Sequence, residues 1–185
     1  MGQAPHSWPR CAPANGAELW LKLEYWNPTG SMKDRMALAM DEGAERDGLI
    51  APGDTIVEYT GGSTGPALAL VCRAKGYRAL IVIADCFTEE RFQLMRALGA
   101  ELDVVASVEG RPKVTAQDIH NMVARAEELA KEHGHYATDQ CRNPYIIPAT
   151  ATGSGARSGS RPAGELPVSA RASERAARSW ACPTP

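Results

Sequence analysis

Two glycine-containing segments of this 185-residue chain hold side chains that could do chemistry. In the first, Asn-Pro-Thr-Gly-Ser-Met-Lys-Asp-Arg over residues 27–35, a Pro/Gly turn brings Lys33 to the predicted first turn of a helix. The helix dipole and free N–H groups there disfavour a positive charge. If it is also desolvated, such a lysine becomes a neutral amine that attacks a carbonyl to form a Schiff base. Taken alone, a surface lysine balanced by Asp34 is the simpler interpretation.

The second segment, Glu-Tyr-Thr-Gly-Gly-Ser-Thr-Gly-Pro over residues 58–66, stands between a predicted strand end and a predicted helix start. Its glycines let the backbone approach a ligand closely, and its N–H groups and hydroxyls favour an anion such as a carboxylate or phosphate. The segment is neither a Walker loop nor G-x-G-x-x-G, so it does not indicate a nucleotide site. A glycine-rich turn with a threonine cap is the structural alternative. The candidate ligand-binding residues are Thr60, Gly61, Gly62, Ser63 and Thr64.

Alternating strands and helices position these two segments. The hydrophobic periodicity predicts strands at residues 19–25, 55–59, 79–84, 102–106 and 135–138, the last of them short. It predicts helices at residues 31–47, 64–75 and 88–98, closed by Gly48, Gly76 and Gly99, and a fourth helix that starts at Thr115 with a capping box to Asp118. Because strands and helices alternate, we expect an α/β fold with three layers and a small parallel sheet.

Composition divides the chain into two parts and excludes several classes of protein. Residues 148–185 are dominated by Ala, Ser, Arg, Gly and Pro, carry a charge of +3 against −5 for residues 1–147, and are expected to be disordered. This tail has the composition of a shifted reading frame in GC-rich DNA, a hypothesis that translating the coding DNA in its other frames tests. The net charge of −2 offers no basic face for nucleic acid.

The remaining composition points to the cytoplasm. We find no membrane-spanning run and no signal-peptide pattern, so neither a membrane protein nor an exported one is expected. The five cysteines are an odd number without a C-x-x-C pair and are expected to be reduced. Of these, Cys72 and Cys86 lie in or beside apolar stretches and are predicted to be core residues.

Residues 1–147 resemble the cysteine synthase and cystathionine β-synthase family, the fold-type II pyridoxal-phosphate enzymes related to the tryptophan synthase β-subunit. The resemblance is carried by LKLEYWNPTGSMKDR, EYTGGSTGPALALVCRAKGY and ALIVIADCFTEERFQLMRALGAEL. It implies that Lys33 carries pyridoxal 5'-phosphate covalently and acts as the general base. It also implies that Thr60, Gly61, Gly62, Ser63 and Thr64 bind the substrate carboxylate, and that the protein is a homodimer.

The resemblance further implies β-replacement or β-elimination on an amino acid such as O-acetylserine or serine. Ser63 stands where the commoner family loop has the asparagine that bonds the cofactor's 3-hydroxyl, and serine reaches less far. Residues 34–147 would form the small α/β domain of the catalytic unit. Relatives continue for about as long again, through the glycine-rich phosphate cup, so we expect impaired cofactor binding and activity. An inactive fragment and a cofactor-free anion-binding or interaction module stay open as alternatives.

Other polar groups have simpler explanations. His133, His135 and Cys141 lack a fourth ligand and a known metal spacing, so no metal site is predicted. The acidic residues Asp41, Glu42 and Glu45 share one predicted helix and are expected to form its solvated face.

Overall fold

The computed structural model describes residues 6–7, 20–21 and 23–151. Of the tail predicted at residues 148–185, residues 152–185 lie outside the described part of the chain, as do residues 19 and 22 of the strand predicted at 19–25. The described elements are β1 His6–Ser7, β2 Trp20–Leu21, η1 Glu24–Trp26, α1 Lys33–Arg46, β3 Thr55–Tyr59, α2 Thr64–Lys75, β4 Arg78–Ala84, α3 Glu89–Ala97, β5 Glu101–Val105, α4 Ala116–His133, β6 Tyr136–Ala137 and α5 Ile146–Ala149. None of the described helices is both long and apolar enough to cross a bilayer.

The predicted parallel sheet is confirmed, with four strands in the order β5-β4-β3-β6. The two central strands are in register from Thr55 opposite Arg78 to Tyr59 opposite Val82. Because all four strands run in one direction, their carboxyl ends lie at one edge of the sheet. The loops that follow β3 and β6 therefore meet at that edge.

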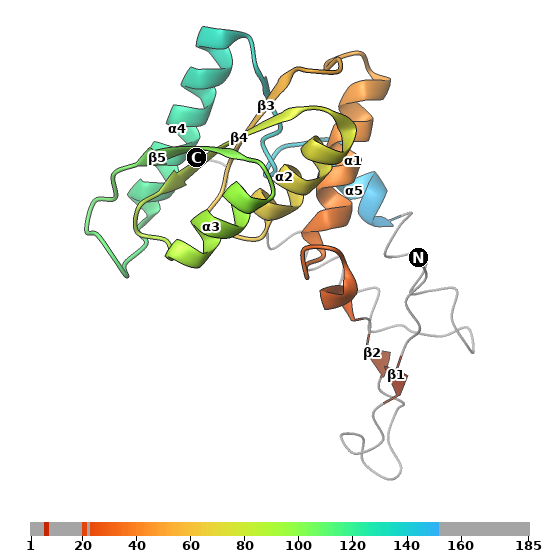
Figure 1. Ribbon diagram of the computed structural model, residues 1–185, viewed down its shortest axis with the longest axis horizontal. Coiled ribbons are helices and arrows are strands. Elements are labelled where there is room, and N and C mark those ends of the chain that lie inside the picture. Colours follow the sequence, from red (N-terminus) through yellow and green to blue (C-terminus); the bar gives the residue numbers. More distant parts are fainter. Residues whose placement is uncertain (1–5, 8–19, 22, 152–185) are drawn as a thin grey trace.

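Helices cover both faces of this sheet, which gives the predicted three layers (Figure 1). On one face, α4 packs against the strands through a core that includes Val57, Val82 and Met122. On the other, α2 and α3 contact the sheet and α1 packs against α2. This second core includes Met40, Ile56 and other fully buried apolar side chains. Both faces of β3 and β4 are thus apolar, as expected for central parallel strands.

The chain before α1 differs from its prediction. The alternation of residues 19–25 predicted a strand, but the strand β2 is only Trp20–Leu21, paired antiparallel with β1, and residues 24–26 form the 3-10 helix η1. The rings of Tyr25 and Trp26 stack at 5.8 Å between centroids and are largely exposed. The chain turns into η1 after β2, so the alternation of residues 19–25 does not continue as one strand.

Helix α1 is fixed at its carboxyl half by a residue close to the end of the described chain. A side chain at Gly43 would place its Cβ only 2.3 Å from Cγ of Tyr145, so the Tyr145 ring lies directly on the helix backbone. The Tyr145 hydroxyl donates to Asp47 at 2.7 Å, and the ring lies under the Arg46 guanidinium. The segment through α5 is therefore part of the packed unit.

The acidic group on α1 is not the solvated face predicted from the sequence. Asp41 is fully buried, Glu45 is half-buried and binds Lys75 and the Tyr77 hydroxyl at 2.8 Å each, and only Glu42 is exposed. The Cys72 thiol of α2 donates to one Asp41 oxygen at 3.7 Å, while the other oxygen is without a hydrogen-bond partner. The prediction failed because α2 packs across this face of α1.

We predict that Asp41 makes the stability of the fold depend on pH. Burial raises the pKa of Asp41 from 3.8 to about 7, so the folded chain binds this proton more tightly than the unfolded chain does. Stability should therefore fall as pH rises from about 4 to 7. Relative to the wild type, Asp41→Asn should gain about 2 kcal/mol in free energy of unfolding between pH 5 and pH 8, measured by urea denaturation. Glu42→Gln, at the exposed neighbour, is the control, and an equal pH dependence in Asp41→Asn and wild type would contradict the prediction.

Candidate functional site

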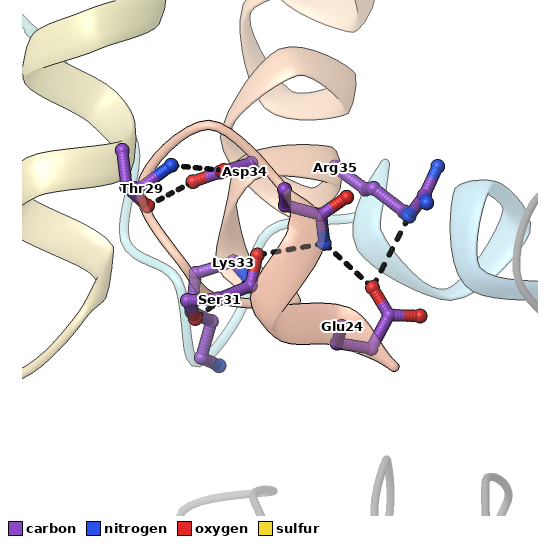
Figure 2. Close-up of polar contacts among 7 residues, drawn as sticks. Glu24, Thr29, Ser31, Lys33, Asp34 and Arg35 are labelled. Carbon is purple, nitrogen blue, oxygen red and sulfur yellow. Dashed lines mark hydrogen bonds and ion pairs between the residues drawn. The ribbon is translucent and has the colours of Figure 1, made fainter. Parts of the chain in front are cut away.

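A tight turn delivers Lys33 to the start of α1. The Gly30 N–H donates to the Asn27 carbonyl at 2.8 Å, and Gly30 has a φ of +77°, a conformation that favours glycine. The Asn27 side-chain amide then donates to the Ser31 carbonyl at 2.9 Å and to Glu24 at 2.6 Å. Glu24 in turn pairs with Arg35 at 3.3 Å (Figure 2). The Asn-Pro-Thr-Gly-Ser segment is thereby fixed against the helix that it precedes.

Asp34, on the first turn of α1, binds the same turn through hydrogen bonds to Thr29. Its carboxylate accepts from the Thr29 N–H at 2.8 Å and from the Thr29 hydroxyl (Figure 2). Asp34 is almost fully buried, so it does not serve as the surface counter-charge to Lys33 that the simpler interpretation required. It positions the backbone from which Lys33 projects.

The Lys33 amine is partly withdrawn from water. The helix begins at Lys33 with Met32 at its N-cap, so the predicted cap by Ser31 is wrong. The Ser31 hydroxyl instead accepts from the Lys33 N–H at 3.1 Å, just before the helix. The Nζ atom lies 3.6 Å from the Met36 sulfur. Burial lowers the pKa of Lys33, and the neighbouring Cys141 and Glu58 oppose this shift. The amine is thus biased toward its neutral, nucleophilic form, mainly by desolvation.

The glycine loop follows β3 and enters α2, as predicted. The Thr60 N–H extends the ladder to the Val82 carbonyl at 3.0 Å, after which the Gly62 N–H turns back to the Thr60 hydroxyl at 3.0 Å. Helix α2 begins at Thr64, so its free first-turn N–H groups lie at the end of the loop. Ser63 is exposed there and faces solvent or a ligand.

Two of the three hydroxyls that were expected to point at an anion are bound within the protein. Thr60 and Thr64 are buried, the first accepting from Gly62 and the second donating to the Gln140 side chain at 2.7 Å. These two hydroxyls hold the loop in shape on its buried side, where the segment after β6 packs against the loop. Backbone N–H groups and Ser63 are the groups left to contact a ligand at this surface.

The glycines of the loop are required by packing more than by a ligand. A Cβ on Gly61 would lie 1.8 Å from Cζ of Phe87, and one on Gly65 would lie 2.4 Å from the Met95 sulfur. By contrast, the nearest atom to a Cβ on Gly62 is the Thr60 hydroxyl oxygen at 3.8 Å. Phe87 and Met95 therefore pack directly against the loop backbone. At Gly62 there is room for a ligand to approach the backbone closely.

Gln140, to which no role was predicted, joins the two sides of the site. Its side chain accepts from the Thr64 hydroxyl and donates to the Tyr59 carbonyl at 3.1 Å, while its N–H donates to the buried Glu58 carboxylate at 3.0 Å. Two features of the sequence could have indicated this role. One is a charged residue inside the apolar strand Thr55–Tyr59, and the other is the group of polar residues after the last parallel strand.

The candidate residues gather at the carboxyl edge of the sheet. Glu58 at the end of β3 and Cys141 beyond β6 both act to raise the pKa of Lys33, so the amine lies within electrostatic reach of both residues. His133 and His135 precede β6, at the opposite edge from Cys141. Among the described residues, no group of three or more His, Cys, Asp or Glu side chains could hold a metal ion.

Comparison with known sequences gives consistent matches. Residues 2–155 match the family described as pyridoxal-phosphate dependent enzyme. A cysteine synthase of Staphylococcus aureus is 47% identical over 130 residues, which cover 70% of this chain and 39% of that protein. Cysteine synthase B of Escherichia coli is 44% identical over 135 residues, covering 73% of this chain and 42% of that protein. The chain thus spans about two fifths of the length of these relatives.

Solved structures agree with the sequence matches. The crystal structure of O-ureido-L-serine synthase superposes with a TM-score of 0.74 at 35% identity, covering 83% of this chain and 46% of that one. A hydrogen sulfide-producing enzyme from Fusobacterium nucleatum superposes with a TM-score of 0.67 at 35% identity, covering 76% of this chain and 43% of that one. The similarity therefore includes the three-layer unit described above.

We predict that Gly61→Ala is destabilising because of Phe87. The added methyl group overlaps the ring and should cost about 1–3 kcal/mol in free energy of unfolding, measured by urea denaturation. In a Phe87→Ala background the same change should cost less than half as much, since the obstructing ring is absent. Gly62→Ala is the matched control and should cost under about 1 kcal/mol. An equal cost for Gly61→Ala with and without Phe87 would contradict the assignment.

Proposed function

Because this chain belongs to the family of pyridoxal-phosphate dependent enzymes, we propose that Lys33 binds pyridoxal 5'-phosphate covalently and that the residue 60–64 loop binds the carboxylate of an amino-acid substrate. The reaction we propose is cysteine synthase-like β-replacement or β-elimination on an amino acid such as O-acetylserine or serine. The names of the matched relatives support this reaction class. Because the chain spans two fifths of their length, the proposal covers only the part of the site that Lys33 and residues 60–64 form.

One observation carries the proposal: the partly buried Lys33 amine lies within electrostatic reach of Glu58, on the strand from which the glycine loop extends into a helix. The chemistry of the residues fits the cofactor. Burial lowers the pKa of Lys33, which favours the neutral amine that an aldehyde requires. The Asn27 and Asp34 contacts hold the turn from which this amine projects, so the nucleophile is presented on rigid backbone.

Each residue then has a role that its surroundings support. When bound, pyridoxal phosphate supplies an electron sink for the carbanion that forms at the substrate α-carbon. Lys33 would hold the cofactor through Nζ, and the same atom would accept the proton from the substrate α-carbon. The N–H groups of Gly61 and Ser63 would bind the substrate carboxylate, in the loop bend that the Gly62 N–H bond to the Thr60 hydroxyl holds. The exposed Ser63 would contact the cofactor's 3-hydroxyl, as the resemblance implies.

The setting of this activity is part of the proposal. Within the described chain Cys72, Cys86 and Cys141 form no disulfide, which supports a reducing compartment such as the cytoplasm. The homodimer that the resemblance implies stays a prediction. A cofactor-free anion-binding module is the competing function, because the loop could receive an anion without any covalent step.

Labelling with pyridoxal phosphate tests the assignment of Lys33. After incubation near pH 7 and borohydride reduction, peptide mass spectrometry should find the pyridoxyl group on Lys33 at least tenfold more often than on the exposed Lys113. The reason is that burial lowers the pKa of Lys33 and leaves more neutral amine. For the same reason, Lys33 labelling should persist to lower pH.

Two variants serve as controls. Lys33→Ala should lose the dominant label, whereas Lys113→Ala should keep it. Uniform labelling of all lysines would overturn the enzymatic proposal. If sulfate then perturbed the amide resonances of residues 61–64, the anion-binding alternative would be favoured.

A further inference from the structure

A carboxylate lies behind the glycine loop with no access to water. Glu58, near the end of β3, is 1% exposed. Three neutral groups donate to its two oxygens: the Tyr59 N–H at 3.0 Å, the Thr138 hydroxyl at 2.6 Å and the Gln140 N–H at 3.0 Å. Burying an acid destabilises a fold unless hydrogen bonds compensate for the lost water, as these three do. A buried acid in an apolar strand therefore indicates a specific role.

The contacts of Glu58 fix a strained piece of backbone. Asp139, between the two residues that donate from beyond β6, has a φ of +43°, in the left-handed region. Such a conformation persists only where the flanking residues are held. Thr138 and Gln140 are both held by Glu58, so the carboxylate fastens the bend from both sides.

This bend carries the side chain that locks the loop. The Gln140 amide spans from the Tyr59 carbonyl to the Thr64 hydroxyl, at 3.1 and 2.7 Å. Thr64 opens α2 and is the last residue of the candidate loop. A continuous series of hydrogen bonds therefore runs from Glu58 through Gln140 to the start of α2.

The network accepts Glu58 with or without its proton. The Thr138 hydroxyl has one hydrogen but two acceptors in reach, Glu58 at 2.6 Å and the Val57 carbonyl at 3.2 Å. With Glu58 ionised, that hydrogen points to the carboxylate. With Glu58 protonated, the acid donates to Thr138 and the hydroxyl hydrogen turns to Val57. The Gln140 N–H bond is stronger to the ionised acid, because hydrogen bonds to a charged acceptor are about twice as strong.

The charged groups around Glu58 come from each packed segment. Lys33 on α1 favours the ionised acid, Asp139 after β6 opposes it, and the Tyr59 hydroxyl lies on the same strand. Burial is the largest influence and raises the pKa of Glu58 to about 7. Its change of charge therefore falls in the neutral range.

We propose that Glu58 is a positioning residue, which holds Gln140 against Thr64 and tightens the start of α2 and the glycine loop when it ionises. The inference deepens the proposed function and rests on it only for the identity of the ligand that the loop receives. The positioning itself concerns hydrogen bonds within this chain.

Backbone and side-chain NMR of the full chain tests the proposal. The amides of Tyr59, Gln140 and Thr64 and the Gln140 side-chain NH₂ should titrate together with a midpoint near pH 7. Glu58→Gln should abolish this titration at all four positions. Glu101→Gln, at an exposed carboxylate on β5, should leave it unchanged.

Substitutions at Thr138 test the mechanism if Glu58→Gln does not fold. Thr138→Val removes a donor to the carboxylate and should move the midpoint upward by about one pH unit, whereas Thr138→Ser should keep it. Titration confined to Tyr59 and Gln140 N–H, without Thr64, would overturn the positioning role, as would a midpoint unmoved by Thr138→Val.

Labelling of Lys33 by pyridoxal phosphate, run on the same samples, separates the two proposals. Label on Lys33 without the shared titration would refute the role of Glu58 and leave the proposed function intact. The shared titration without label would leave Glu58 as a positioning residue and refute the proposed function.

Discussion

Polar groups buried at the carboxyl edge of a parallel sheet must find their partners within the protein, and the site is built around this requirement. The strands β3 and β6 pair in parallel, and Thr60 and Thr138, the residues that directly follow them, are buried. Glu58, Thr64 and Gln140 satisfy one another there. The loop surface that remains for a ligand is what these internal bonds leave free, namely backbone N–H groups and Ser63.

The same principle accounts for the turn at Lys33. Asn27 and Asp34 bind backbone groups that the Pro/Gly sequence would otherwise leave unpaired. These hydrogen bonds hold the turn, and with it the backbone from which the Lys33 amine projects. At the α1/α2 contact the principle is only partly met, since one oxygen of Asp41 lies buried without a donor. The buried carboxylate lowers the stability of this interface, and its charge depends on pH.

Sequence reasoning predicted the elements well where periodicity and capping agree. The strand Thr55–Tyr59, the helix Thr64–Lys75 and the capping box of Thr115 with Asp118 are confirmed. It failed where burial depends on a partner element: Asp41 lies on a helix whose polar face is covered by α2, and residues 24–26 lack a sheet to join. Gln140 could not be assigned because its role comes from packing against Thr64, 76 positions away in the chain.

The contact between Gly43 and Tyr145 has a consequence for biosynthesis. Helix α1 emerges early from the ribosome, yet its carboxyl half cannot reach its final packing until the chain has been extended by about a hundred residues. Contacts of such long sequence separation slow folding, so the carboxyl half of α1 completes its packing only after nearly all of the described unit has been synthesised.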